Sequence, residues 1–367
     1  MKITALVYCE NEFGKVDGKV TNGLLRNSDK YEIVGIIDST KAGQDSGQCL
    51  DGIKNSVPIF QNIEDALYHL TIIPSCFIYG IAPFSTFLNI KERAIIKNAI
   101  KKGMNIINGL PEFFADDNEF VEMAKEYHVE LYDIRKPPIR THLHHFTGDI
   151  HALTTPIIAI LGTDCAVGKR TTALRLVKAL NIKGVNTVFI ATGQTGILQG
   201  AKYGVAIDML SSGFATGEVE HAILTADKAE NPDIIIVEGQ GALSHPAFTS
   251  SSAILKGSSP DAVIIQDAPK RKNHCDYPNI SIPPLNYEIN LIEAFSDTEV
   301  IAITINHEGM TDKELENTIN EYEMIYELTT TDVLKYGCNK LIDKIIDQFP
   351  QLQKKYSDLK NHVNSKN

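Results

Sequence analysis

The chain alternates short apolar runs with segments in which apolar residues recur at helical spacing. In its first part, β-branched runs that predict buried parallel strands lie at Ile3–Tyr8, Ile33–Ile37, Cys76–Ile81 and Asn105–Ile107. Helical spacing predicts helices between them, at Ile63–Leu70 and Glu92–Lys101. Strands that alternate with helices are typical of α/β domains with a parallel sheet. We therefore expect an α/β domain over residues 1–140, with a last strand that begins at Leu131.

A second α/β domain follows a stiff connector. Pro137 and Pro138 end the last strand of the first domain, and we place a linker at residues 141–155 and the second domain at residues 156–367. Its strands are predicted at Ile157–Leu161, Thr187–Ala191, Ile234–Val237, Ala262–Ile265 and Val300–Ile305. Apolar residues at helical spacing predict a helix over Thr171–Asn181.

The junction between the first of these strands and its helix carries the clearest chemical signal. It reads Gly162-Thr163-Asp164-Cys165-Ala166-Val167-Gly168-Lys169-Arg170-Thr171-Thr172. A glycine-bounded loop between a strand and a helix directs backbone N–H groups and the positive helix end toward an anion, and a lysine adds charge. Gly168 allows the backbone to approach a phosphate closely. We predict that these eleven residues form a P-loop that binds the phosphates of a cofactor.

The loop departs from the ordinary P-loop pattern in two ways. Five residues separate Gly162 from Gly168, so Thr163 stands where the first glycine normally falls. Arg170 occupies the position of the hydroxyl that usually binds Mg²⁺. Phosphate binding is therefore predicted more strongly than hydrolysis of a magnesium-bound nucleotide.

Two more glycine-rich segments follow strands of the second domain. They are Thr192-Gly193-Gln194-Thr195-Gly196 and Glu238-Gly239-Gln240-Gly241. Ligands of open parallel sheets bind beyond the carboxyl ends of the strands. We therefore expect a cleft shared with the P-loop, in which the substrate is bound by Thr192, Gly193, Gln194, Thr195, Gly239, Gln240 and Gly241.

Three side chains near these strand ends are predicted to be catalytic. Glu238 is a carboxylate at the end of an apolar strand, which in nucleotide enzymes holds Mg²⁺ or orients a nucleophile. His245 is the candidate general base, since imidazole titrates near neutral pH. Asp208 is a weaker candidate for contact with a substrate amine. Glu218 reads as a residue at a helix start. Cys165 reads as a thiol in an anion loop, where a covalent role stays open as the weaker alternative to phosphate binding.

Composition excludes several classes of protein. The net charge is −11 and basic runs such as Lys270–Lys272 read as solvated loops, so we expect no nucleic-acid binding. The six cysteines form no Cys-x-x-Cys pair, which indicates a reducing compartment. The N-terminus reads as a strand rather than a signal peptide, and the apolar window Ile72–Ile90 is broken by prolines. We expect a soluble cytoplasmic protein that forms a homo-oligomer and does not bind membranes.

Asp38 and the histidines of the linker can each be interpreted as functional or as structural residues. Asp38 closes the second strand where dinucleotide-binding folds place a ribose-binding acid. The turn from Cys9 to Gly23 lacks G-x-G-x-x-G, so we expect a Rossmann-like domain that supports assembly or lines a shared cleft. The linker holds His142, His144, His145 and His151, which are dense enough for a metal but more often supply hydrogen bonds. We therefore assign no metal site.

The motifs resemble two known families. The string from Gly162 to Lys169 is similar to the phosphate loop of dethiobiotin synthetase, which has a threonine where this chain has Arg170. A broader resemblance spans nearly the whole chain. It rests on the P-loop, Ala191–Gly196 and Val237–Pro246, and upstream on Gly35–Ser39, Asn108–Phe113 and Asp133–Pro138. These segments look like a bacterial and archaeal family long catalogued as a domain of unknown function.

That broader resemblance implies a fold and a reaction. The family pairs a Rossmann-like domain with a P-loop NTPase-like domain that has a mainly parallel sheet, and members are assigned as D-glutamate N-acetyltransferases that use acetyl-CoA. A P-loop without the Mg²⁺ hydroxyl suits coenzyme A, and Arg170 can bind phosphate oxygens directly. Glu238 or His245 would deprotonate the amine, and glycine amides would stabilise the oxyanion.

Two other functions stay open. An ATP-dependent enzyme of the dethiobiotin synthetase type would activate a carboxylate, with Mg²⁺ bound by Asp164, Thr171 and Glu238. A nucleotide-sensing assembly protein would bind a nucleotide without turnover. A requirement for Mg²⁺ distinguishes the first of these from the acetyltransferase.

Overall fold

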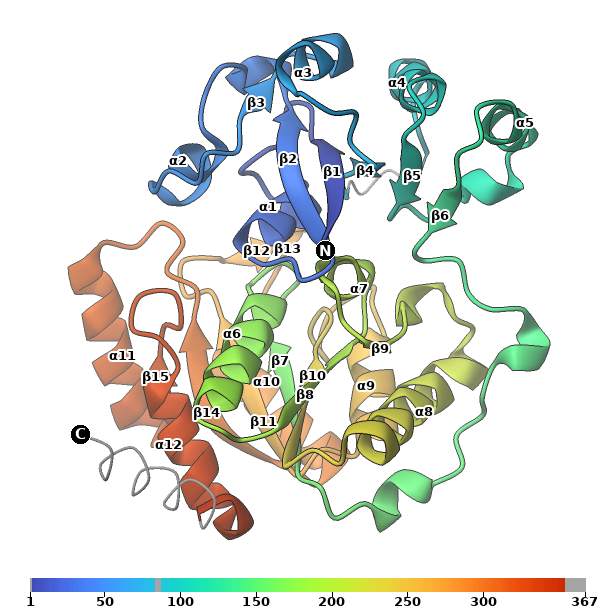
Figure 1. Cartoon of the computed structure of the whole chain (residues 1–367). Coiled ribbons are helices and arrows are strands. Elements are labelled where there is room, and N and C mark those ends of the chain that lie inside the picture. Colours follow the sequence, from blue (N-terminus) through green and yellow to red (C-terminus); the bar gives the residue numbers. More distant parts are fainter. Residues whose placement is uncertain (1, 83–86, 354–367) are drawn as a thin grey trace, which may run out of the picture. The chain divides into compact units, whose positions relative to one another are not determined.

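The computed structural model describes residues 2–82 and 87–353, which fold into helices and parallel sheets (Figure 1). The chain divides into two compact units. The first comprises the residues up to Pro138 together with Gln194–Ala201, and the second comprises Ile139–Gly193 together with the residues from Lys202. The predicted fold class, α/β with parallel sheets, is confirmed.

The first unit is built on a six-stranded parallel sheet of order β3-β2-β1-β4-β5-β6. Its strands are β1 (Ile3–Tyr8), β2 (Tyr31–Ile37), β3 (Ile59–Phe60), β4 (Cys76–Tyr79), β5 (Asn105–Asn108) and β6 (Leu131–Asp133). Its helices are α1 (Lys19–Arg26), α2 (Ser46–Asp51), α3 (Ile63–His69), α4 (Ile90–Lys101) and α5 (Asn118–Glu126), with short 3₁₀ turns η1 (Ser39–Lys41) and η2 (Phe114–Asp116). The four strands predicted before β6 are present, and the one predicted to reach Ile81 ends at Tyr79.

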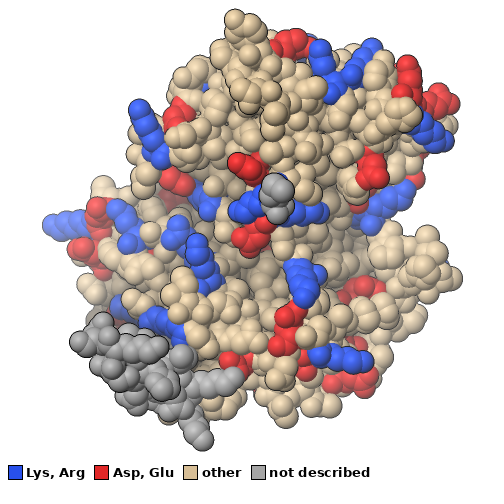
Figure 2. Space-filling model, in the orientation of Figure 1, with Lys and Arg blue, Asp and Glu red and all other residues tan. Residues whose placement is uncertain are grey.

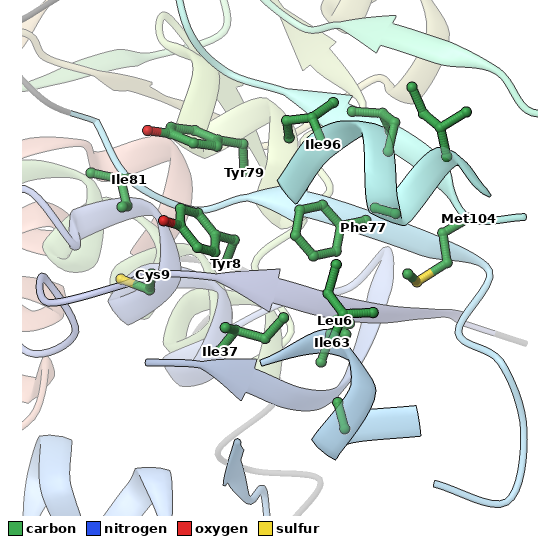
Figure 3. Packing of buried hydrophobic residues seen from close by; sticks show 14 of the residues in the cluster. Leu6, Tyr8, Cys9, Ile37, Ile63, Phe77, Tyr79, Ile81, Ile96 and Met104 are labelled. Atoms are coloured by element: carbon green, nitrogen blue, oxygen red, sulfur yellow. The ribbon is translucent and has the colours of Figure 1, made fainter. Parts of the chain in front are cut away.

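Both faces of the central strand β1 are buried, as a parallel sheet covered by helices requires. Figure 3 shows Leu6 and Tyr8 of β1 in one apolar cluster with Phe77 and Tyr79 of β4 and Ile96 of α4. The alternate residues of β1 face a second apolar cluster on the other side of the sheet. The apolar run in β1 therefore reflects burial on two sides.

The second unit is built on a seven-stranded parallel sheet of order β15-β14-β11-β7-β10-β8-β9. Its strands are β7 (Ile157–Gly162), β8 (Thr187–Ala191), β9 (Tyr203–Gly204), β10 (Ile234–Glu238), β11 (Ala262–Asp267), β14 (Glu299–Ile305) and β15 (Thr329–Thr331). The short strands β12 (Asn273–His274) and β13 (Tyr277–Ser281) form an antiparallel hairpin between β11 and the next helix.

The helices of the second unit are α6 (Lys169–Ile182), α8 (Ser212–Glu230), α9 (Ser250–Ser258), α10 (Leu285–Ser296), α11 (Asp312–Tyr326) and α12 (Asn339–Gln348). Three 3₁₀ turns, η3 (Arg140–His142), η4 (Asp149–Ala152) and η5 (Ile207–Met209), complete it. Figure 1 shows α8 and α9 side by side, and α11 and α12 beside β15. The predicted strands are present, and the helix predicted to begin at Thr171 begins at Lys169.

Strand β7 lies between β11 and β10, and all six of its residues are buried. Because these strands are parallel, the loops that follow β8, β10, β7, β11 and β14 all leave the same edge of the sheet. The candidate chemistry of the second unit therefore gathers at this edge.

One helix departs from the expected division. Helix α7 (Gln194–Gln199) follows β8 in sequence but belongs to the first unit, where the Gln199 amide donates to the carbonyls of Gly23 and Asn27 at 2.8 Å each. The predicted substrate residues Gln194 and Thr195 lie in this helix, whereas Thr192 and Gly193 belong to the second unit.

Lysine and arginine side chains lie among aspartates and glutamates on the face shown in Figure 2. Among the described residues, the longest apolar helices are too short or too polar to cross a membrane.

Candidate functional site

The loop from β7 to α6 has the backbone of an anion-binding turn. Gly168 has a φ of +115° and Ala166 a φ of +52°, so the chain turns through left-handed conformations just before the helix begins. A Cβ on Gly162 would lie 2.7 Å from the carbonyl oxygen of Gln266, so this position is restricted to glycine. The loop therefore presents successive N–H groups and the N-terminus of α6 to one point.

Lys169 extends back over this loop. Its side chain is 6% exposed, and Nζ donates to the carbonyl oxygen of Asp164 at 2.5 Å. Burial lowers the pKa of Lys169, and the negative charges of Cys165 and Asp164 oppose that shift. The lysine is held where its charge faces the loop.

Two loop hydroxyls are committed to the neighbouring strand β11. Thr172 donates to the side-chain oxygen of Gln266 at 2.5 Å, and Thr163 donates to Asp267 at 2.8 Å. Gln266 also accepts from Thr304 of β14 at 2.5 Å. These bonds anchor the loop to the sheet, and cofactor binding by Thr163 and Thr172 stays a prediction. Of the predicted hydroxyls, Thr171 alone has no such bond to β11 among the described residues.

Asp164 lies at the centre of a polar cluster and is fully buried. Its carboxylate accepts from His274 Nδ1 at 2.8 Å, from the Cys275 N–H at 2.9 Å and from Arg271 at 3.0 Å. Burial alone raises the pKa of Asp164, but these three hydrogen bonds outweigh it and hold the pKa below its ordinary value. Asp164 is therefore a carboxylate whose oxygens already have partners.

Cys165 follows Asp164 and is half-buried. A hydrogen bond from the Cys275 thiol is the main cause that lowers the pKa of Cys165, and burial opposes it. Hydrogen bonding to His245 and the charge of Lys169 lower that pKa further. The same pairing raises the pKa of Cys275, whose thiol donates to the Cys165 carbonyl oxygen at 3.7 Å.

The geometry of His245 indicates which ring nitrogen carries hydrogen. Nδ1 accepts from the backbone N–H groups of Ala247 and Phe248, both at 3.2 Å. A neutral ring whose Nδ1 accepts must carry its hydrogen on Nε2. Nε2 is buried, forms no hydrogen bond that meets strict geometric criteria, and lies 3.7 Å from Asp164 Oδ1. In this arrangement the N–H of the neutral ring is on Nε2, and the role of His245 as a general base stays a prediction.

The loop that carries His245 is fixed by Glu288 of α10. The buried carboxylate of Glu288 accepts from the N–H groups of Leu243 at 2.6 Å and Ser244 at 3.2 Å. The His245 ring stacks on Phe248 with 4.6 Å between ring centroids. Glu288 thus fixes the residues before His245, and Phe248 packs on its ring from the residues after it.

Glu238 ends β10 and is 4% exposed. It accepts from the Thr192 N–H at 3.1 Å. Burial raises the pKa of Glu238, and the charges of Arg170 and Lys169 oppose that shift. A carboxylate with a raised pKa is a stronger proton acceptor than an ordinary carboxylate.

The glycines after β8 and β10 pack too closely for larger residues. A Cβ on Gly239 would lie 2.1 Å from the Ile160 carbonyl oxygen, and one on Gly193 would lie 2.7 Å from the Gln240 side chain. The Gln240 side chain donates to the Thr192 carbonyl oxygen. Thr192, Gly193, Gly239 and Gln240 thus lie together with Glu238 at one strand edge, and their binding of substrate stays a prediction.

Other predicted residues lie outside this cluster of contacts. Asp208 is exposed in η5, and its catalytic role stays a prediction. Glu218 was expected at a helix start, but α8 begins at Ser212. The Glu218 carboxylate accepts from the backbone N–H of His144 at 2.6 Å and from its ring at 3.0 Å.

Two histidines of the linker, His144 and His145, stack on another ring or bond to the backbone. The ring of His144 stacks on that of His221 at 3.5 Å, and His145 bonds the Gly213 carbonyl oxygen. Within the part of the chain that the structure describes, the groups placed to hold a metal are Asp164–His245–His274 and Cys165–His245–Asp276, and neither includes a linker histidine.

Sequence reasoning missed the residues that surround Asp164. The run Lys270–Lys272 was expected to be a solvated loop, but Arg271 is half-buried and donates to Asp164, to the Cys165 carbonyl oxygen at 2.7 Å and to Glu308. His274 and Cys275 come from the β12–β13 hairpin. No sequence signal connects this hairpin with a loop more than 100 residues earlier, as the spacing between Asp164 and His274 shows.

Comparison with known proteins identifies the family. The DUF1611 family models match twice, as a Rossmann-like N-terminal domain over residues 39–137 and as a P-loop domain, both of unknown function, over residues 144–342. The chain is 33% identical over 275 residues to a D-glutamate N-acetyltransferase of a Pseudoalteromonas species, which covers 72% of this chain and 80% of the relative. It is 26% identical to a D-glutamate N-acetyltransferase of Tritonibacter scottomollicae, over 73% of this chain and 80% of that relative.

A solved structure extends the match to the fold. The crystal structure of a DUF1611 family protein from Anabaena variabilis superposes with a TM-score of 0.86, at 29% identity, over 94% of this chain and 100% of that chain. The predicted Rossmann-like and P-loop domains are confirmed by the two family matches. The chain belongs to the DUF1611 family.

Proposed function

We propose that this protein is an amino-acid N-acetyltransferase, which moves an acetyl group from acetyl-CoA to the amino group of D-glutamate or a similar amino acid. Two relatives that each match more than 70% of the chain carry the name D-glutamate N-acetyltransferase. The second domain supplies the anion-binding loop that a phosphate-bearing acyl donor needs.

One observation favours this reaction over magnesium-dependent ATP chemistry. Of the three groups that would hold Mg²⁺, the Asp164 carboxylate is already occupied by Arg271, His274 and the Cys275 N–H. Arg170 replaces the usual hydroxyl. A hard cation such as Mg²⁺ needs free oxygen ligands. The loop is thus better suited to an anion without a metal.

The remaining residues supply the steps of acetyl transfer. The amine must lose a proton, and Glu238 is the carboxylate at this edge whose pKa is raised by burial. The tetrahedral intermediate carries a negative oxygen, which backbone N–H groups of residues 193–196 or 239–241 would stabilise. His245, held as an N–H donor, adds a further hydrogen bond donor beside the loop.

Ligand-induced stabilisation tests the donor. Melting temperatures are measured with acetyl-CoA and with ATP, each with Mg²⁺ and with EDTA, because a ligand that binds the folded state raises the melting temperature. We expect acetyl-CoA to stabilise the protein equally with EDTA and Mg²⁺. Lys169→Ala should abolish the shift, and Lys178→Ala, an exposed lysine of the same helix, should retain it. Stabilisation by ATP only with Mg²⁺ would favour carboxylate activation instead.

A further inference from the structure

Three side chains from distant segments of the second unit bring possible metal ligands close together. They are Cys165 of the P-loop, His245 of the loop after β10 and Asp276 of the turn between β12 and β13, called here the Cys–His–Asp group. The sulfur, a ring nitrogen and a carboxylate oxygen all lie within 4.8 Å of one another. No metal site was predicted from the sequence, because no spacing motif connects these three segments.

One nitrogen of His245 is left without a partner. Nδ1 is occupied, because it accepts from the N–H groups of Ala247 and Phe248. Nε2 belongs to a side chain that is 0% exposed, forms no hydrogen bond that meets strict geometric criteria, and lies 3.7 Å from Asp164 Oδ1. Buried polar atoms are almost always satisfied by protein, water or an ion. This nitrogen therefore points to a ligand at the group.

A second group, Asp164, His245 and His274, is less suited to an ion. The Asp164 carboxylate accepts from His274 Nδ1 at 2.8 Å and forms an ion pair with Arg271 at 3.0 Å, so its oxygens already have partners. Asp276, by contrast, is half-buried and forms no ion pair with a lysine or arginine in the described part of the chain. The Cys–His–Asp group is therefore the better ligand set.

We propose that the Cys–His–Asp group binds one Zn²⁺ ion, a site that goes beyond the proposed acetyltransferase function and does not depend on it. Thiolate, imidazole and carboxylate are zinc ligands, and three protein ligands with an open fourth position form a common zinc site. Bond lengths of about 2.0–2.3 Å place tetrahedral ligand atoms about 3.3–3.6 Å apart, so the three side chains need to close by only about 1 Å. Mg²⁺ is disfavoured, because it prefers oxygen ligands.

Zinc binding exchanges hydrogens for the ion. The Cys165 thiol releases its proton to solvent, and the ion takes the place of the hydrogen on His245 Nε2, which is released as a second proton. The ring then carries negative charge, which the N–H groups of Ala247 and Phe248 stabilise through Nδ1. The carboxylate of Asp276 is the third negatively charged ligand.

The cations beside the site do not outweigh these ligands. Arg271 is paired with Asp164 at 3.0 Å and with Glu308 at 2.9 Å, so its charge is neutralised. Lys169 donates to the Asp164 carbonyl oxygen at 2.5 Å and adds a single positive charge. Three negative ligands therefore face one uncompensated cation of these two.

The segments that carry the ligands are fixed by other contacts. Asp164, which precedes Cys165, accepts at 2.9 Å from the N–H of Cys275, which precedes Asp276. This bond holds the P-loop and the hairpin beside each other. Glu288 fixes the loop after β10 through two backbone N–H groups. The ligands are thus positioned by neighbours that do not bind the ion themselves.

The ion also has a consequence for turnover if the proposed function is correct. Acetyl transfer uses His245 as an N–H donor, and zinc takes the place of that hydrogen. We therefore expect the zinc-bound protein to turn over more slowly than protein assayed in EDTA.

Titration with Co²⁺ tests the site in the full chain. The protein is freed of metal with a chelator, desalted, kept reduced with a phosphine and titrated with Co²⁺ alone, whose thiolate complexes absorb in the near ultraviolet by charge transfer from sulfur. Zn²⁺ is then added to displace the cobalt. Cys165→Ser, His245→Gln and Asp276→Asn are compared with Cys49→Ser, which changes a half-buried cysteine of the first unit.

We expect one Co²⁺ per chain and a charge-transfer band that Zn²⁺ removes, both retained in Cys49→Ser. Cys165→Ser should lose the band, and His245→Gln and Asp276→Asn should weaken binding by more than about tenfold. Melting temperatures of the metal-free variants show whether each is folded. Asp276→Asn changes a half-buried side chain without changing its shape, so it keeps the test valid if His245→Gln unfolds.

Failure of the folded wild type to bind Co²⁺ stoichiometrically would overturn the zinc site. Binding without a charge-transfer band, or a band that survives in Cys165→Ser, would overturn it as well. The titration contains neither acetyl-CoA nor an amino acid, so these results leave the acetyltransferase proposal untouched, and failure of acetyl transfer would leave the zinc site untouched.

Discussion

Arg271 and Asp164 form a buried ion pair, with 3.0 Å between Nη1 and Oδ2, that joins the segment after β11 to the P-loop. Arg271 also donates to the Cys165 carbonyl oxygen and to Glu308. A single guanidinium thus fixes the P-loop and neutralises the Asp164 carboxylate within it.

We predict that Arg271→Ala destabilises the protein strongly. Removing one partner leaves the Asp164 carboxylate buried without its cation, which costs about 3 kcal/mol of unfolding free energy. Denaturant midpoints measure this loss. Lys270→Ala is the matched control, because the adjacent Lys270 forms an exposed ion pair with Glu314 and should leave the midpoint unchanged. Equal changes in denaturant midpoint for Arg271→Ala and Lys270→Ala would show that the buried ion pair stabilises the protein no more than an exposed one.

The raised pKa of Glu238 predicts opposite effects on activity and stability. Glu238 must be ionised to accept the amine proton, so turnover should rise as pH increases through its raised pKa. Glu238→Gln should lower kcat by about 10²–10⁴-fold at neutral pH and leave KM for acetyl-CoA unchanged. A variant that retains wild-type kcat and pH profile would exclude Glu238 as the base.

The stability effect of Glu238→Gln has a definite sign. A carboxyl group whose pKa is raised by folding binds its proton more tightly in the folded state, so it costs stability as pH rises from its ordinary pKa through the raised one. Glu238→Gln should therefore raise the melting temperature near pH 8 and have little effect near pH 4. An increase confined to acid pH would contradict the burial of an ionisable carboxyl group.

Glu288 is predicted to act as a positioning residue for His245. Glu288→Ala leaves the buried N–H groups of Leu243 and Ser244 without an acceptor, at a cost of about 2 kcal/mol, and it releases the loop. We expect Glu288→Ala to lower kcat. Glu288→Gln, which keeps one side-chain oxygen as an acceptor, should have a kcat between those of Glu288→Ala and the wild type. Glu293→Ala on the same helix, which removes one acceptor for the Val300 N–H, should leave kcat unchanged. Steady-state kinetics measure the effect on the positioning of His245, and denaturant midpoints measure the effect on stability.

Glycine positions at the strand edge should differ sharply in tolerance. Gly239→Ala places a methyl group 2.1 Å from the Ile160 carbonyl oxygen, so β10 and β7 must separate and the protein should lose more than about 2 kcal/mol. Gly213→Ala on α8 meets nothing within 4 Å and should be neutral or stabilising. Melting temperatures of both variants test how closely Gly239 approaches the Ile160 carbonyl oxygen.

The sequence predicted the parts of the site that are formed by contiguous residues. It did not predict the contacts between segments that are distant in the chain. The P-loop could be found because a strand, a glycine turn, a lysine and a helix are contiguous in Gly162–Thr172. Thr172 was assigned to the cofactor because its partner, Gln266, is revealed only by the pairing of β7 with β11. The role of His245 depends on two backbone N–H groups that follow it, whose direction is set by the fold of the loop.

The hairpin β12–β13 explains the largest omission. Arg271 lies in a run of three basic residues, the pattern of a solvated loop, and His274 and Cys275 follow without a recognisable motif. Their proximity to Asp164 follows from where the chain returns after β11. Similarly, nothing in Gln194 or Thr195 indicates that α7 belongs to the first unit.

The most direct test of this account is the release of coenzyme A from acetyl-CoA, measured with D-glutamate, L-glutamate and no acceptor, in the presence of EDTA and without ATP. We predict release that depends on the amino acid, matches the N-acetylated product in amount and is unaffected by EDTA. Turnover that appears only when ATP and Mg²⁺ are added would contradict the account, as would the absence of release with every amino acid tested.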